Sequence, residues 1–154
     1  MQKIIIYVII RIINKKGTIL SHIELLKNHE LKATPQRLCI LDTLEECGHA
    51  TLEDIQKIIS KKFPTLSLST IYRNLNDMVN QDIVSEVKFA NKKDYFEISK
   101  NKHIHLVCQE CGKIEDFEIE TDDISRKIED LTGDKVLNDT ISFDVICKDC
   151  LSAK

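Results

Sequence analysis

The chain has 154 residues, 42% of them hydrophobic and 31% charged, which supplies enough apolar side chains for a folded core and excludes a disordered chain. Its formal net charge of −3 gives no global reason to expect a nucleic-acid partner, but residues 1–99 carry 14 Lys and Arg against 12 Asp and Glu, whereas residues 100–154 carry 8 against 13. The two parts of the chain therefore differ in net charge, and only the first is basic enough to bind phosphate groups.

Residues 1–20 are interpreted as an N-terminal extension without chemistry of its own. Residues 4–13 are apolar apart from Arg11, and this run is shorter than the ~18–20 apolar residues of a membrane span. No small-residue cleavage site of a secretory signal follows it. We therefore expect a cytoplasmic protein with no membrane partner.

Three helices are predicted between residues 21 and 63. The first is a short helix over 21–30. The second begins at Thr34-Pro35, because threonine caps a helix N-terminus and proline fits the first turn, and Gly48 ends it. Thr51 opens the third, with acidic residues in the first turn where the helix dipole favours them, and this helix is expected to end near residue 63.

A fourth helix and a hairpin are predicted next. Ser67 or Ser69 caps the helix, whose apolar residues recur on one face. Two β-rich runs, 83–89 and 95–98, flank a polar turn and predict a hairpin. Helices followed by a hairpin are typical of a winged helix-turn-helix domain, with the hairpin as the wing, over residues 21–99.

From Lys100 the pattern changes to strands and one helix. The predicted elements are a strand His103–Cys108, a strand Lys113–Ile119, a helix Asp122–Leu131 and a long strand Val136–Cys147. A segment as short as residues 100–154 rarely folds by burial alone and needs a metal or a second copy of the chain. The fold class is therefore α+β: an N-terminal winged helix-turn-helix domain followed by a small α/β dimerisation domain at 100–154.

Two C-x-x-C pairs predict a structural zinc site. Cys108 with Cys111 and Cys147 with Cys150 each place two thiolates on one tight turn, as a tetrahedral zinc requires. With all four positions filled by protein, the ion has no open site for catalysis. Buried cysteines without function, a redox dithiol and a plain zinc-ribbon interaction module are the alternatives.

A second metal site is predicted from harder donors. His103 and His105 are two residues apart on a predicted strand and share one face, while Cys108 points to the opposite face. His49, Glu97 and Asp116 are the further candidates. Imidazole and carboxylate donors suit Fe(II), Mn(II) or Zn(II), and ligands from both parts of the chain would couple domain orientation to metal binding. A hydrolytic metalloenzyme is the alternative with such a donor set, although no nucleophile is recognisable and we expect a non-enzyme.

The chain resembles the ferric uptake regulator family from about residue 21 to residue 150. The resemblance is carried by Ala33-Thr34-Pro35-Gln36-Arg37, Gly48-His49-Ala50, Ser69-Thr70-Ile71-Tyr72-Arg73-Asn74-Leu75, His103-Ile104-His105 and the paired C-x-x-C motifs. It implies a metal-dependent repressor that binds operator DNA as a homodimer, with a structural zinc and a regulatory Fe(II) or Mn(II).

Within the family, Asp116 and the absence of histidines after His105 resemble the peroxide-responsive members. There, peroxide oxidises a histidine ligand of Fe(II) and the repressor leaves its operator, and by the same matching His49 and His103 are the expected targets. Two residues depart from that pattern: Glu97 stands where the best-known peroxide regulators have Asp, and Arg73 where some have Asn. An iron-responsive repressor of iron uptake, or a zinc-responsive one, is the alternative.

The DNA contacts are expected from the fourth helix in the major groove and from lysines on and beside the wing. Tyr72 offers apolar contact to thymine methyl groups, and Arg73 can reach guanine or phosphate. A dimer would bind a palindromic, AT-rich operator. The candidate DNA-binding residues are Lys32, Ser67, Ser69, Thr70, Tyr72, Arg73, Asn74, Lys92 and Lys93.

Overall fold

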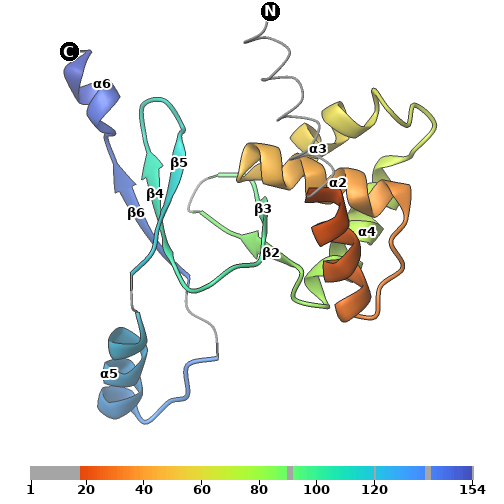
Figure 1. Ribbon diagram of the computed structural model, residues 1–154. Coiled ribbons are helices and arrows are strands. Elements are labelled where there is room, and N and C mark those ends of the chain that lie inside the picture. The colour runs from red at the N-terminus through yellow and green to blue at the C-terminus, as the bar shows by residue number, and fades with distance from the viewer. Residues whose placement is uncertain (1–17, 90–91, 120, 138–139, 154) are drawn as a thin grey trace, which may run out of the picture. The chain divides into compact units, whose positions relative to one another are not determined.

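The computed structural model describes residues 18–89, 92–119, 121–137 and 140–153 (Figure 1). The chain divides into two compact units, one ending at Ser99 and the other beginning at Lys100. Most of the predicted N-terminal extension, residues 1–17, lies outside the described residues, and residues 18–20 already belong to a helix that continues to residue 28. Among the described residues, no helix is both long enough and apolar enough to cross a membrane.

Three further helices of the first unit are α2 (Pro35–Cys47), α3 (Leu52–Ile59) and α4 (Leu68–Val79). The predicted caps are confirmed: Thr34, Thr51 and Ser67 each accept a hydrogen bond from the backbone N–H three residues on, which satisfies a donor that the helix leaves open. The prediction that the third helix ends near residue 63 is wrong, because α3 stops at Ile59 and a chain of turns follows.

A three-stranded antiparallel sheet completes the first unit, in the order β1 (Ala50–Thr51), β3 (Tyr95–Ile98), β2 (Val84–Val87). Strands β2 and β3 form the predicted hairpin, whose turn includes residues 90–91, outside the described residues. Strand β1 was not predicted. The helices and this sheet share one core, made by Leu26, Ile40, Leu41, Leu44, Ile55, Ile59, Ile71, Leu75, Met78, Ile83 and Phe96.

The second unit holds a sheet in the order β5 (Ile114–Phe117), β4 (Ile104–Cys108), β6 (Ile141–Val145), with α5 (Asp122–Thr132) between β5 and β6 in the chain. Strand β4 pairs antiparallel with β5 and parallel with β6. The long strand predicted from residue 136 is too long, since β6 begins at Ile141 and residues 133–137 are irregular. A short helix, α6 (Lys148–Ser152), was not predicted.

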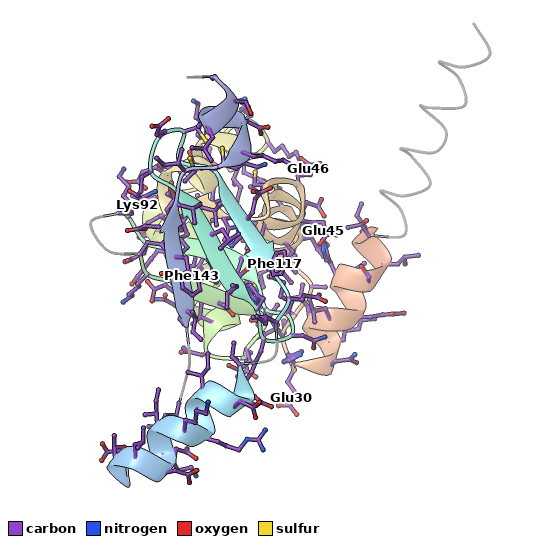
Figure 2. The ribbon with its side chains drawn as sticks, turned by 90° about the vertical axis from the view of Figure 1, so that its left-hand side faces the viewer. Glu30, Glu45, Glu46, Lys92, Phe117 and Phe143 are labelled. Atoms are coloured by element: carbon purple, nitrogen blue, oxygen red, sulfur yellow. The ribbon has the colours of Figure 1, made fainter. Side chains whose placement is uncertain are left out.

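The strand register divides the side chains of the second sheet between two faces. Phe117 lies opposite Ile104 and Phe143 lies opposite Leu106, so these side chains share one face, whereas Asp116 lies opposite His105 on the other. Phe117 and Phe143 are 59% and 52% exposed and are labelled on β5 and β6 in Figure 2. The sheet therefore has a polar face that carries histidine and an apolar face that is largely uncovered.

Candidate metal and DNA sites

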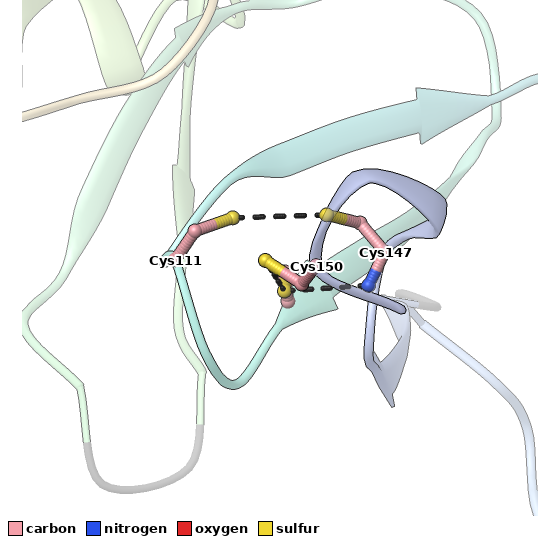
Figure 3. A group of neighbouring side chains, drawn as sticks. Cys111, Cys147 and Cys150 are labelled. Atoms are coloured by element: carbon pink, nitrogen blue, oxygen red, sulfur yellow. Dashed lines mark hydrogen bonds between the residues drawn. The ribbon is translucent and has the colours of Figure 1, made fainter. Parts of the chain in front are cut away.

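The four cysteines of the two C-x-x-C motifs converge at one end of the second sheet (Figure 3). Their sulfurs all lie within 4.8 Å of one another, with 3.9 Å between Cys108 and Cys150 and 3.8 Å between Cys111 and Cys147. Sulfurs bound at ~2.3 Å to a tetrahedral zinc lie roughly 3.8 Å apart. The spacing thus fits a four-thiolate zinc site with no open position.

Local structure explains why each C-x-x-C motif turns back on itself. After β4 the chain reverses in a turn closed by the Gly112 N–H, which donates to the Cys108 carbonyl at 3.0 Å, and Gly112 has φ of 75°, which glycine adopts without strain. Cys147 is the N-cap of α6 and Cys150 lies one turn further along that helix. The helix that sequence analysis missed therefore presents half of the thiol cluster.

The electrostatics of the cluster favour a cation. Hydrogen bonds from the backbone N–H groups of Cys111 and Cys147 lower the pKa of Cys108 to about 6, which favours the thiolate that zinc binds. Hydrogen bonding with the Cys147 and Cys111 side chains raises the pKa of Cys150 to about 12. Four sulfurs this close cannot all ionise without a compensating positive charge, and a dication among them supplies it.

On the opposite face of the same sheet, two imidazoles and a carboxylate converge. His103 Nε2 lies 3.1 Å from His105 Nε2, and Asp116 Oδ1 lies 3.9 Å and 3.7 Å from these two nitrogens. Donors that bind one ion at about 2.1 Å are roughly 3.0 to 4.2 Å apart. The three atoms therefore have the separations of neighbouring ligands on a single metal ion.

Two neighbouring residues that sequence analysis missed orient this cluster. His103 Nδ1 lies 2.8 Å from the Asn101 carbonyl oxygen, so a proton on Nδ1 is donated there and Nε2 carries a lone pair. The Lys100 ammonium bonds to Asp116 Oδ2, which leaves Oδ1 toward the histidines. No motif marks either residue, because their roles come from the backbone path before β4 and from the β4–β5 register.

The remaining metal-ligand candidates lie together in the first unit. Strand β1 pairs Ala50 with Phe96, so His49 is one register step beyond, opposite Glu97. His49 Nε2 is 3.3 Å from Glu97 Oε2, and Glu97 is buried. Burying a carboxylate is costly unless it is paired, hydrogen-bonded or bound to a metal, and the neighbouring imidazole makes this pair a suitable donor set for a cation.

The candidate DNA-binding residues gather on α4, on the loop before α2 and on the wing. Tyr72 is 47% exposed and Arg73 is exposed. At the start of α4, the Ser67 hydroxyl is hydrogen-bonded to the hydroxyls of Ser69, at 2.9 Å, and Thr70, at 2.8 Å.

Polar contacts hold several of the other candidates in place. The Asn74 amide donates to the Thr70 carbonyl at 2.8 Å. On the wing, Lys93 Nζ is 2.7 Å from Glu53 Oε1, and Lys92 is half-buried. Lys32 is exposed. The exposed side of α4 thus presents an aromatic ring and a guanidinium that the surrounding contacts leave accessible.

Comparison with known proteins places these features in one family. The ferric uptake regulator family model matches residues 28–150. A peroxide-responsive repressor of Staphylococcus saprophyticus is 33% identical over 127 residues, covering 81% of this chain and 86% of the relative, and the peroxide operon regulator of Bacillus subtilis is 32% identical over 130 residues, covering 83% and 90%.

Solved structures agree. The Campylobacter jejuni peroxide stress regulator is similar with a TM-score of 0.64 and 36% identity, covering 83% of this chain and 98% of that one. The Vibrio cholerae ferric uptake regulator gives a TM-score of 0.65 and 30% identity, covering 81% and 98%. With a family model that spans most of the chain and relatives matched over most of their length, the chain belongs to the ferric uptake regulator family.

Proposed function

We propose that the protein is a metal-dependent transcriptional repressor, which binds operator DNA as a homodimer and is released when hydrogen peroxide oxidises a histidine ligand of its regulatory Fe(II). The observation that carries the proposal is a donor set of imidazoles and a carboxylate, held apart from the thiolate site on the opposite face of one sheet. The peroxide regulators among the relatives support the same function.

The regulatory ion is proposed to take ligands from both units: His49 and Glu97 from the first, and His103, His105 and Asp116 from the second. Support comes from the donor separations within each unit, 3.3 Å in the first and 3.1 to 3.9 Å in the second. Nitrogen and oxygen donors suit Fe(II) or Mn(II), whereas the thiolates select zinc. Metal binding would then fix the orientation of the two units and so favour DNA binding.

The peroxide response depends on the imidazoles. A bound Fe(II) would supply the electron that cleaves the O–O bond of hydrogen peroxide. Overall, peroxide would oxidise the imidazole by two electrons, with one oxygen atom inserted into a ring C–H bond and the other leaving as water. His103 presents Nε2 to the site because its Nδ1 faces the Asn101 carbonyl, and the ring carbon between the two nitrogens is therefore beside the ligand atom. An imidazole that gains oxygen at this carbon is a poorer donor, so the set that joins the two units loses a member.

Operator binding is assigned to residues 21–99 and dimerisation to residues 100–154. Helix α4 would place Tyr72 and Arg73 at base edges, while the start of α4 and the wing lysines contact phosphates. Phe117 and Phe143 on the apolar face of the second sheet, and Ile124 and Ile128 of α5, are exposed apolar side chains, which a second copy of the chain would cover. A symmetric dimer requires a palindromic operator.

The cytoplasm, where thiols stay reduced, is the proposed site of action.

Mass spectrometry of the Fe(II)-loaded protein after mild peroxide treatment tests the proposal. Peptides containing His49 or His103 should gain one oxygen atom, and operator binding should fall in parallel. The Mn(II)-loaded protein is the matched control and should keep both unmodified histidines and operator binding. Oxidation confined to the cysteines would contradict peroxide sensing through the histidine site.

An iron-responsive repressor is the second candidate. The structure of the Vibrio cholerae ferric uptake regulator is 30% identical to this chain, and Glu97 gives this site a carboxylate longer than that of the usual peroxide regulators. Operator binding that follows iron supply and survives peroxide with intact histidines would favour this function.

A further inference from the structure

Arg37 and Asp77 form an ion pair that joins the second helix to the proposed recognition helix. Arg37 Nη2 donates to Asp77 Oδ2 at 2.6 Å, and Arg37 Nη1 donates to the Lys32 carbonyl at 3.1 Å. The Arg37 side chain is only 13% exposed, whereas that of Asp77 is 43% exposed. One guanidinium therefore links α4 to the loop that carries Lys32, and it is too buried to reach DNA itself.

Arg37 and Asp77 each lie at the end of a helix where the helix dipole disfavours their charge. Arg37 is the third residue of α2, at the helix end whose dipole repels cations, and Asp77 lies in the last turn of α4, at the end that repels anions. Each residue is therefore unfavourable for its local helix. The pair forms across the tertiary structure, and its role lies beyond the stability of either helix.

Asp77 also lies four residues after Arg73 on the same helix. Side chains at this spacing are neighbours, and arginine and aspartate there attract each other. In the described part of the chain, Asp77 pairs with Arg37, while Arg73 is exposed and forms no ion pair. The Asp77 carboxylate thus has two possible partners, Arg37 and Arg73, and in the structure it pairs with the buried Arg37.

We propose that Arg37 is a positioning residue for operator recognition, which holds Asp77 so that Arg73 stays available to base edges. This inference rests on the proposed function, in which Arg73 contacts the operator. Without Arg37, the Asp77 carboxylate would pair with Arg73 and would also stand unneutralised beside the phosphate backbone. Both effects weaken binding, and the first lowers discrimination between operator and other sequences.

A double-mutant cycle tests the proposal. The probe is a palindromic duplex selected by the Mn(II)-loaded wild-type protein from a random AT-rich library, and affinity is compared with that for a scrambled duplex. Arg37→Gln should weaken operator binding about tenfold, the size of one lost arginine–base contact, and reduce the operator-to-scrambled ratio. Asp77→Asn should strengthen binding about twofold because it removes a negative charge near phosphate. Adding Asp77→Asn to Arg37→Gln should restore most of the lost affinity.

The decisive arm is the Arg73→Ala background. There, Arg37→Gln should have less than half of its effect on operator affinity, because the residue through which it acts is absent. Equal effects in both backgrounds, or failure of Asp77→Asn to restore binding, would overturn the proposal. If Arg37→Gln does not fold, as judged by circular dichroism, the Asp77→Asn prediction still applies, and weaker binding by that variant refutes the inference. A wild-type protein that selects no duplex would instead contradict the proposed function.

Discussion

Removal of one of the four proposed zinc ligands should unfold the second unit and leave the first intact. The perturbation is Cys150→Ser, which deletes the thiol on α6 whose sulfur lies 3.9 Å from that of Cys108. The matched control is Cys47→Ser, since Cys47 is an exposed cysteine outside the thiol cluster. Serine replaces a soft thiolate with a poor zinc ligand at almost the same size.

The magnitude follows from how little apolar surface the second unit buries. Ile104 and Val107 are its buried aliphatic side chains among the described residues, and at ~1.5–3 kcal/mol each they contribute about 3–6 kcal/mol. Structural zinc contributes ~10–16 kcal/mol of apparent binding free energy at neutral pH. The metal therefore outweighs the core, and a site with three thiolates should leave this unit without a stable fold.

Two spectroscopic signals separate the units in this experiment. The chain has no tryptophan, and its three tyrosines all precede residue 100, so tyrosine fluorescence reports the first unit alone. Far-UV circular dichroism reports both. Cys150→Ser should lose zinc, lose its strand signal and become sensitive to proteolysis after Lys113, while the tyrosine transition in urea stays unchanged. A variant that keeps one equivalent of zinc and a protease-resistant second unit would refute this reasoning.

Three further outcomes are expected. Asp54→Asn should cost about 1 kcal/mol of unfolding free energy by weakening the cap of α3. The hydrogen bond from the Thr51 side chain lowers the pKa of Asp54, so this stabilisation is complete above about pH 4 and is lost as the pH falls through the folded-state pKa. Urea titrations at several pH values would measure this loss. Lys100→Gln should raise Mn(II) affinity roughly tenfold in calorimetry, because it removes a cation that is bonded to Asp116 and repels the metal ion. An unchanged affinity would show that the Lys100 charge does not oppose metal binding. Phe143→Asp should produce monomers in sedimentation velocity, unlike Leu20→Asp, since both residues are exposed but only Phe143 lies on the apolar sheet face.

Sequence patterns predicted most of the helices because their signals are local. Thr34-Pro35 and Thr51 act on backbone groups within one turn, so the starts of α2 and α3 can be predicted without tertiary information. The predictions failed for strands whose extent depends on pairing with a distant strand. Strand β1 is too short for any pattern, and it exists only because Ala50 pairs with Phe96. Strand β6 has fewer residues than its β-rich sequence predicts, because among the described residues its pairing with β4 covers Ile141–Val145.

The sequence by itself determined the chemistry of this protein: two pairs of soft thiols, a separate set of imidazoles and carboxylates, and the capped helices of a DNA-binding domain. These follow from residue type and short spacing, which chemistry constrains directly. Tertiary structure decided which side chains meet across long separations. The β4–β5 register brings Asp116 to His105, and helix packing brings Arg37 to Asp77, 40 residues away. Such contacts depend on strand register and on the shape of the shared core, which no local pattern specifies.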